Sequence, residues 1–227
     1  MKLLIAILSC LALAACASKQ TPEKIHVSNR APDPQPASIL FIGNSYSFHV
    51  PGELRRIAAR DGVKLRVRQV TNGGWTLGQH SANDGTLHAI REGGWDYVVI
   101  QEQSRIPSQT LKRSHAMFPH VRKLADEARD AGAVPVLYQT WGRRDGDEWL
   151  HGKDDFHAMN RRLREGYRQA AQYAGGLAVV PVGDAWEREV DAGRGAELYQ
   201  DDGSHPSARG DRLAARVFYE TLFPKPF

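Results

Sequence analysis

The chain has 227 residues, with 30 Lys and Arg against 26 Asp and Glu and a formal net charge of +4 at pH 7. The basic residues are scattered among acidic ones, which argues against a nucleic-acid-binding surface and predicts at most weak attraction to anionic polymers. Both cysteines, Cys10 and Cys16, lie close to the N-terminus. A mature chain that begins at Cys16 therefore has no second cysteine with which to form an internal disulfide.

Residues 1–15 have the pattern of a signal peptide. A single Lys2 precedes an apolar run that is too short for a typical membrane-spanning helix, and small residues follow it. Residues 13–16, Leu-Ala-Ala-Cys, resemble a bacterial lipobox, in which the cysteine becomes the acylated first residue. We therefore expect an exported bacterial lipoprotein that is anchored to a membrane through Cys16. The alternative is an ordinary secretory signal with an incidental cysteine.

The segment that follows has the composition of a linker. Residues 16–36 contain four prolines and few apolar side chains, which predicts an extended tether between the lipidated Cys16 and the folded part. Ala17 takes the place of the aspartate that tends to retain such lipoproteins in the inner membrane, so outer-membrane sorting, on the periplasmic side, is favoured. Residues 37–227 are enough for one well-cored domain.

Apolar runs alternate with helical patterns through this domain. We expect strands at 38–42, 63–70, 96–101, 133–138 and 177–182. One helical stripe contains Leu111, Phe118, Val121, Leu124, Ala125 and Ala128, and a final helix starts near Ser207. Repeated strand–helix units predict an α/β fold, namely a three-layer α/β/α sandwich around a five-stranded parallel sheet. In such folds ligands bind outside the carboxyl ends of the strands.

Side chains suited to nucleophilic catalysis follow several of these strands. Ser45 comes directly after the first strand, within Gly-Asn-Ser, while Asp202 and His205 lie three residues apart before the last helix. A serine nucleophile needs a base to take its proton, and the base needs an acid that fixes its tautomer. Asp202 and His205 can supply both, and Asp201 is an alternative acid with less favourable spacing.

The same strand ends offer donors for an oxyanion. Gly74 follows the second strand, and without a Cβ it lets a backbone N–H approach closely. The Gln103 carboxamide follows the third strand and the Ser45 N–H follows the first. Together these three groups are candidates for stabilising the negative charge that develops when a serine attacks an ester.

In these blocks the chain resembles the SGNH (GDSL-like) hydrolases. Members carry Gly-Asp-Ser or Gly-Asn-Ser at the first strand, then a glycine, then an asparagine, and Asp-x-x-His near the C-terminus. Residues 43–45, Gly74 and residues 202–205 match in that order, and the resemblance runs from residue 38 to 220. It implies a flavodoxin-like sandwich with Ser45 as nucleophile, His205 as base and Asp202 as its partner.

One block departs from the family pattern. Where members usually have Gly-x-Asn-Asp, residues 101–104 are Gln-Glu-Gln-Ser, and Gln103 takes the place of the asparagine. This difference indicates a subgroup with its own version of the block.

Four further side chains are predicted to line the substrate pocket, on the basis of their places at strand ends: Asn44, Trp75, Glu102 and Trp141. The loop 141–149, WGRRDGDEW, is polar and follows a strand end, which is consistent with a sugar-stacking or lid surface. The nine histidines show no ligand-rich spacing, so we expect neither a metal nor another cofactor.

The expected function is that of a membrane-tethered serine esterase. We expect an acylated small molecule or glycan as substrate, with O-deacetylation of a carbohydrate or cell-wall glycan favoured. Two alternatives remain: a lipase- or thioesterase-type acyl hydrolase, and a non-catalytic lipoprotein that binds glycans in the same cleft.

Overall fold

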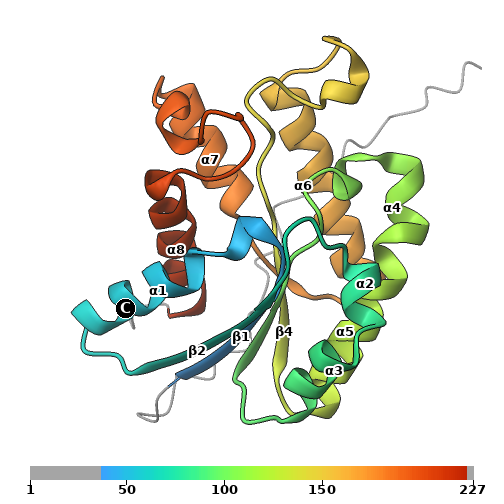
Figure 1. Ribbon diagram of the computed structural model, residues 1–227, viewed down its shortest axis with the longest axis vertical. Helices are drawn as coiled ribbons and strands as arrows, with labels where there is room; N and C mark the ends of the chain where they lie inside the picture. Colours follow the sequence, from blue (N-terminus) through green and yellow to red (C-terminus); the bar gives the residue numbers. More distant parts are fainter. Residues whose placement is uncertain (1–36, 224–227) are drawn as a thin grey trace, which may run out of the picture.

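A computed structural model describes residues 37–223 of the chain (Figure 1). The predicted signal peptide, the lipidated Cys16 and the tether lie outside the described residues, so they stay predictions. Within residues 37–223, no helix combines the length and the apolar character that a membrane span requires.

The core of the molecule is the predicted five-stranded sheet. Its strands are all parallel, in the order β2-β1-β3-β4-β5, which is the flavodoxin-like order. Each predicted strand is present, with ends that differ by at most two residues: β1 (Ala37–Gly43), β2 (Leu65–Thr71), β3 (Tyr97–Ile100), β4 (Val134–Tyr138) and β5 (Ala178–Val180). The predicted fold class is therefore confirmed.

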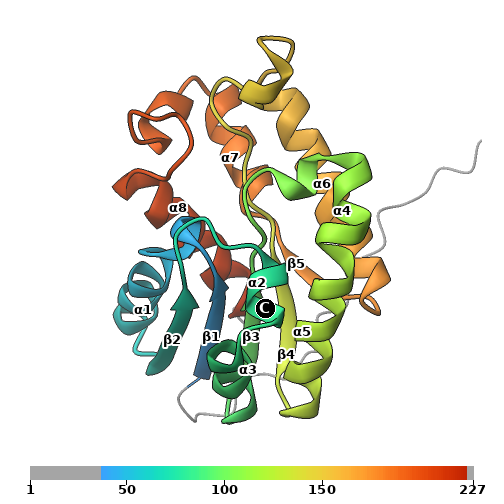
Figure 2. The ribbon, with the colours of Figure 1, turned by 45° about the vertical axis from the view of Figure 1, so that its right-hand side comes forward.

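Helices cover both faces of the sheet, and this gives the three layers. One face carries α1 (Val50–Arg60), α7 (Val182–Asp191) and α8 (Ala208–Leu222). The other carries α2 (Leu77–Ser81), α3 (Asp84–Arg91), α5 (Phe118–Asp130) and most of α6 (Phe156–Tyr173). Figure 2 shows α1 and α8 on the left of the sheet and α5 on the right. The short 3₁₀ helices are η1 (Ser45–Ser47), η2 (Ile106–Ser108), η3 (Glu148–Leu150) and η4 (Gly195–Leu198).

Strand β1 shows why a nearly continuous apolar run is needed here. Ile39 and Phe41 point into the core under α1 and α8, whereas Leu40 and Ile42 point into the core under α3 and α5. All four side chains are fully buried. Full burial of such a side chain contributes about 1.5–3 kcal/mol, so β1 is central to the stability of the domain.

The long helical stripe around residues 111–128 was predicted as one helix, and this is wrong. The structure has two helices there, α4 (Thr110–Ala116) and α5, separated by Met117, whose backbone is not helical (φ −123°, ψ −54°). Pro119 lies in the first turn of α5, where a proline is tolerated because its missing N–H has no helical partner. Leu111 is 87% exposed and is not part of the buried stripe.

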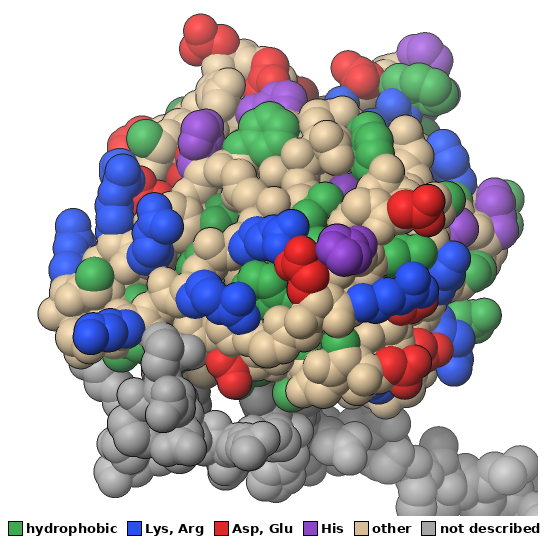
Figure 3. Space-filling view, turned by 60° about the horizontal axis from the view of Figure 1, so that its bottom comes forward, with side chains coloured by type: hydrophobic (Ala, Val, Ile, Leu, Met, Phe, Trp, Pro, Cys, Tyr) green, Lys and Arg blue, Asp and Glu red, His purple; other side chains and the backbone are tan. Residues whose placement is uncertain are grey.

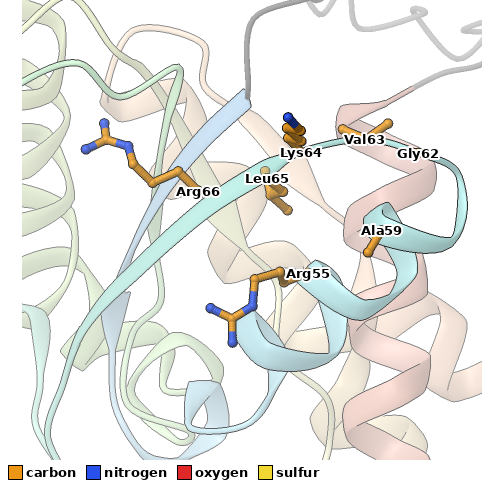
Figure 4. Close-up of a pocket in the computed structure, with 7 residues that line it drawn as sticks. All are labelled: Arg55, Ala59, Gly62, Val63, Lys64, Leu65 and Arg66. Carbon is orange, nitrogen blue, oxygen red and sulfur yellow. The ribbon is translucent and has the colours of Figure 1, made fainter.

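The face at the amino ends of the strands lies at the opposite end of the sheet from Ser45. On the face in Figure 3, basic and acidic side chains both occur among apolar ones. A pocket of about 470 Å³ lies beside the start of β2, lined by Gly62–Arg66 together with Arg55 and Ala59 of α1 (Figure 4). Leu65 pairs with Ala37, the first residue of β1, so this pocket lies at the end of the sheet opposite to Ser45.

Candidate active site

Ser45 lies at the carboxyl end of β1, on the η1 turn that joins this strand to α1. Asn44 shapes the turn, because its side-chain oxygen accepts a hydrogen bond from the Tyr46 N–H at 3.2 Å. The Asn44 side chain also donates to the Trp75 carbonyl at 3.0 Å and is almost fully buried. Asn44 therefore ties the serine turn to the neighbouring loop, and its prediction as a substrate-contacting residue is wrong.

The three predicted catalytic side chains meet at this edge of the sheet. Ser45 Oγ lies 2.9 Å from His205 Nε2, and His205 Nδ1 lies 2.5 Å from Asp202 Oδ2. An Nδ1–H that donates to Asp202 leaves Nε2 free to accept the serine hydroxyl proton. The arrangement can thus activate Ser45 as a nucleophile. Ser45 and His205 are 160 positions apart in sequence, and the fold brings them into contact as predicted.

Asp202 is held in its ionised form. Burial raises the pKa of this carboxyl, but hydrogen bonds from the His205 ring and from the Ser204 and His205 backbone outweigh burial and lower the pKa to about 2. The two backbone N–H groups donate to Asp202 Oδ1, each at 2.9 Å. One carboxylate oxygen therefore orients the loop while the other orients the imidazole.

Buried, stacked aromatic rings pack against the loop that carries His205. Tyr46 packs edge-on against His205, and its hydroxyl lies 2.6 Å from Ser204 Oγ. Trp141 is stacked between Tyr46 and Trp186, with ring centroids 4.7 and 3.8 Å away, and its Nε1 donates to the Ser204 carbonyl at 3.1 Å. Trp141 is fully buried, so the prediction that it contacts substrate is wrong. It positions the loop that carries His205.

Two backbone N–H groups near Ser45 are available to an oxyanion. Within residues 37–223, neither the Ser45 N–H nor the Gly74 N–H donates to a protein acceptor. Gly74 is exposed and has φ +72°, a left-handed conformation that glycine adopts without steric cost. Trp75, the next residue, is half-buried and packs against His80 with ring centroids 5.0 Å apart.

Gln101 fixes the serine turn from the neighbouring strand. Its side-chain oxygen accepts the Asn44 N–H and the Ser47 hydroxyl, both at 2.9 Å. Its side-chain nitrogen donates to the Asn44 oxygen at 3.0 Å. A Cβ on Gly43 would lie 2.4 Å from this oxygen, so the glycine of the Gly-Asn-Ser block is required by the close approach of Gln101.

Glu102 fixes the loop that carries Gly74. Its carboxyl accepts the Leu77 N–H at 3.0 Å, at the start of α2, and the Gln103 N–H at 2.7 Å. The side chain is fully buried, so the prediction of a substrate contact is wrong for Glu102 as well. Burial raises the pKa of Glu102 to about 8, against the smaller lowering effect of the two backbone donors, which favours the protonated carboxyl at pH 7.

Gln103 is half-buried, and the oxygen and nitrogen of its side-chain amide have different partners. The oxygen accepts the Arg105 N–H at 2.9 Å and the Ile106 N–H at 3.4 Å, at the start of η2. The nitrogen lies 3.4 Å from Ser104 Oγ, and its second hydrogen has no protein acceptor in the described chain. One amide hydrogen thus stays available for the predicted oxyanion role.

The loop that follows β4 carries an exposed tryptophan, but it is Trp149 rather than Trp141. The Arg105 guanidinium lies 4.0 Å from the centroid of the Trp149 ring, and Asp147 in turn lies 2.9 Å from Arg105 Nε. Of the two tryptophans in WGRRDGDEW, only Trp149 is exposed to solvent. Within residues 37–223, no group of three or more His, Cys, Asp and Glu is placed to hold a metal.

Comparison with known proteins identifies the family of this chain. No family model and no curated protein matches it. Among solved structures, a protein described as an SGNH hydrolase from Slackia heliotrinireducens is 33% identical, with a TM-score of 0.69 over 82% of this chain and 98% of that one. A lipase/acylhydrolase from Enterococcus faecalis shares the fold at 17% identity, with a TM-score of 0.62 over 84% of this chain and 100% of that one.

A GDSL-like lipase from Parabacteroides merdae also has this fold, at 16% identity and a TM-score of 0.60 over 82% of this chain and 94% of that one. The last two identities are too low to carry more than the fold. The Slackia protein, by contrast, is matched along almost its whole length at one identical residue in three. On this evidence the chain belongs to the SGNH hydrolase family and is a serine hydrolase of ester bonds.

Proposed function

We propose that this hydrolase is an exported esterase that removes O-acetyl groups from a carbohydrate or cell-wall glycan. The observation that carries the proposal is the chain of hydrogen bonds from Ser45 Oγ through His205 to Asp202. This chain supplies a nucleophile, a base and an orienting acid at one edge of the sheet. Attachment to a membrane through Cys16 is part of the proposal and rests on the sequence motif alone.

The first half of the reaction forms an acyl-enzyme. Ser45 Oγ attacks the ester carbonyl carbon while its proton passes to His205 Nε2. The carbonyl oxygen becomes an oxyanion, which accepts hydrogen bonds from the Ser45 and Gly74 N–H groups and the Gln103 amide. The tetrahedral intermediate then expels the sugar oxygen, which takes the proton from Nε2.

The second half restores the enzyme. Water attacks the acyl carbon and gives a proton to His205 Nε2, and a second tetrahedral intermediate forms. Its collapse breaks the bond to Ser45 Oγ, which recovers the proton, and acetic acid leaves. Throughout, ionised Asp202 stabilises the imidazolium. Loss of any one oxyanion donor is expected to cost about 3–4 kcal/mol of transition-state stabilisation.

The preference for a carbohydrate rests on the surroundings of Ser45. The Phe48 ring, three residues after Ser45, is exposed and lines a pocket together with polar side chains. Polar groups next to aromatic faces suit a sugar ring, whereas a long acyl chain needs a continuous apolar channel. The export signal predicted for residues 1–15 would also place the enzyme near glycan material.

Two measurements test the proposal. A fluorophosphonate probe should label the purified protein on Ser45, and Ser45→Ala should abolish labelling, while Ser114→Ala, which alters an exposed serine of α4, should leave it intact. Hydrolysis of p-nitrophenyl esters should fall steeply beyond the acetyl and propionyl esters, and acetylated xylan should release acetate.

Each alternative makes a different prediction for these assays. Labelling that survives Ser45→Ala would contradict the assignment of the nucleophile. Faster hydrolysis of octanoyl than acetyl esters would identify a lipase-type acyl hydrolase. Binding of glycan without turnover of any ester would identify a binding protein.

A further inference from the structure

A pocket of about 630 Å³ is lined by residues that follow Ser45 and His205 in the sequence. One wall is formed by Phe48 and His49, which follow the η1 turn that carries Ser45. The opposite wall is formed by Pro206 and Ser207, which follow His205. The pocket therefore lies between the N-terminal turns of α1 and α8, the two helices that start from the nucleophile and the base. Its volume suits a small ligand such as one or two sugar rings.

Asp211 forms part of the pocket wall without a protein partner for one of its oxygens. The residue lies in the first turn of α8 and is 4% exposed. Its Oδ1 is buried and makes no hydrogen bond to any of the described residues. A buried carboxyl that lacks partners is costly, and such a group in a native fold calls for an explanation such as a bound ligand.

The charged groups around Asp211 restrict what the pocket can bind. Burial raises the pKa of Asp211 to about 6, with His49 and Arg212 lowering it and Glu53 raising it. Asp211 is thus mostly ionised at pH 7, beside the second carboxylate of Glu53, whose charge is paired with Arg56. A carboxylate placed against Asp211 would be repelled, and an alkyl chain there would leave Asp211 unsatisfied. Neutral hydroxyl groups can donate to Asp211 without either penalty.

Two further side chains of the pocket suit a polyhydroxylated ring. The Gln200 side-chain nitrogen donates to the Pro206 carbonyl at 2.9 Å, which leaves its oxygen free to accept a hydrogen bond. The Phe48 ring is 39% exposed and extends to within 4.0 Å of the Cβ position of Gly73, next to Gly74. An apolar face flanked by hydrogen-bond acceptors is complementary to the two faces and the equatorial hydroxyls of a pyranose.

We propose that this pocket is the subsite for the sugar that carries the ester, with Asp211 accepting hydrogen bonds from its hydroxyl groups and Phe48 packing on its ring. The ligand class is a neutral pyranoside with free vicinal hydroxyls. The inference rests on the proposed function, since it assigns the alcohol side of the ester to this pocket. It makes Asp211 a determinant of specificity that takes no part in the chemistry at Ser45.

Binding to an inactive form tests the subsite without turnover. In a Ser45→Ala background, xylotriose and the trimer of N-acetylglucosamine are titrated by calorimetry. At least one should bind, and Asp211→Leu should weaken that binding at least tenfold, with Asp211→Asn in between. Glu220→Gln, which removes an exposed carboxylate near the other end of α8, should have no effect. Since Asp211→Leu removes a buried group that lacks a partner, the variant should fold, and thermal unfolding checks this.

Turnover supplies the second measurement. In the active enzyme, Asp211→Leu should lower the ratio of kcat/KM for acetylated xylotriose to kcat/KM for p-nitrophenyl acetate at least tenfold, mainly through KM. An unchanged ratio, or binding by neither trimer, would overturn the subsite. So would a gain on octanoyl esters with unchanged sugar binding, because the pocket would then hold an acyl chain. Failure of the proposed function looks different: no ester is hydrolysed, although sugar binding can still depend on Asp211.

Discussion

The substitution Glu102→Gln should remove a pH dependence that this buried carboxyl imposes on the stability of the fold. In the unfolded chain the pKa of the carboxyl has its ordinary value of 4.5, and in the folded protein burial raises it to about 8. Between these values the folded protein keeps a proton that the unfolded chain has released. The stability due to Glu102 is therefore fully present below pH 4.5 and is lost as the pH rises towards 8.

The magnitude follows from the two pKa values. One pH unit corresponds to about 1.4 kcal/mol, so the full loss between pH 4.5 and 8 is on the order of 5 kcal/mol. Glutamine keeps the size of the side chain and an oxygen that can accept the Leu77 and Gln103 N–H groups, but it cannot ionise. The Gln variant should consequently gain stability relative to the wild type as the pH rises.

Urea unfolding of both proteins between pH 5 and 9 measures this gain. The free energy of unfolding of the wild type minus that of Glu102→Gln should fall by roughly 1.4 kcal/mol per pH unit up to pH 8 and then level off. Glu220→Gln, on the exposed side of α8, controls for the loss of a surface carboxylate. A difference that stays flat from pH 5 to 8 would mean that Glu102 is ionised in the folded protein, and the burial argument would be refuted.

Two further substitutions test the support and the orientation of His205. Asp202→Asn should lower kcat on p-nitrophenyl acetate roughly 10⁴-fold, because an amide does not stabilise the imidazolium of His205. The circular-dichroism spectrum of the variant should be unchanged. A loss of kcat below tenfold would contradict the role of Asp202. Trp141→Ala should lower the free energy of unfolding by about 3–5 kcal/mol, since it empties the space between Tyr46 and Trp186. A midpoint of urea unfolding that is unchanged from the wild type would contradict this packing role.

The meeting of Ser45 with His205 could be predicted from sequence because the sheet constrains it. Apolar runs identify the parallel strands, and parallel strands that are connected by helices place all their carboxyl ends at one edge. A serine after β1 and a histidine just before α8 must then lie near the same edge. The pattern of strands and helices therefore predicts at which edge of the sheet a residue lies, to within a turn of a helix.

The pattern of strands and helices does not predict the direction in which a side chain at that edge points. For this reason the predictions for Trp141, Asn44 and Glu102 were wrong. A residue just past a strand end can point up into the cleft or down between the helices, and the local sequence is the same in both cases. Trp141 points inwards because its ring stacks between the rings of Tyr46 and Trp186. Those neighbours come from distant parts of the chain, so neither periodicity nor propensity reports them.

Glu102 illustrates the hardest case, because a glutamate is rarely buried unless its charge is paired or removed. Here burial raises the pKa of the carboxyl, which accepts hydrogen bonds from the Leu77 and Gln103 N–H groups, while the Gln101 side chain accepts one from the Asn44 N–H. The Gln-Glu-Gln-Ser block thus joins the serine turn to the Gly74 loop through side chains that never reach solvent. Gln101 and Glu102 of this block therefore hold the loops together, whereas the oxyanion role of Gln103 is a prediction.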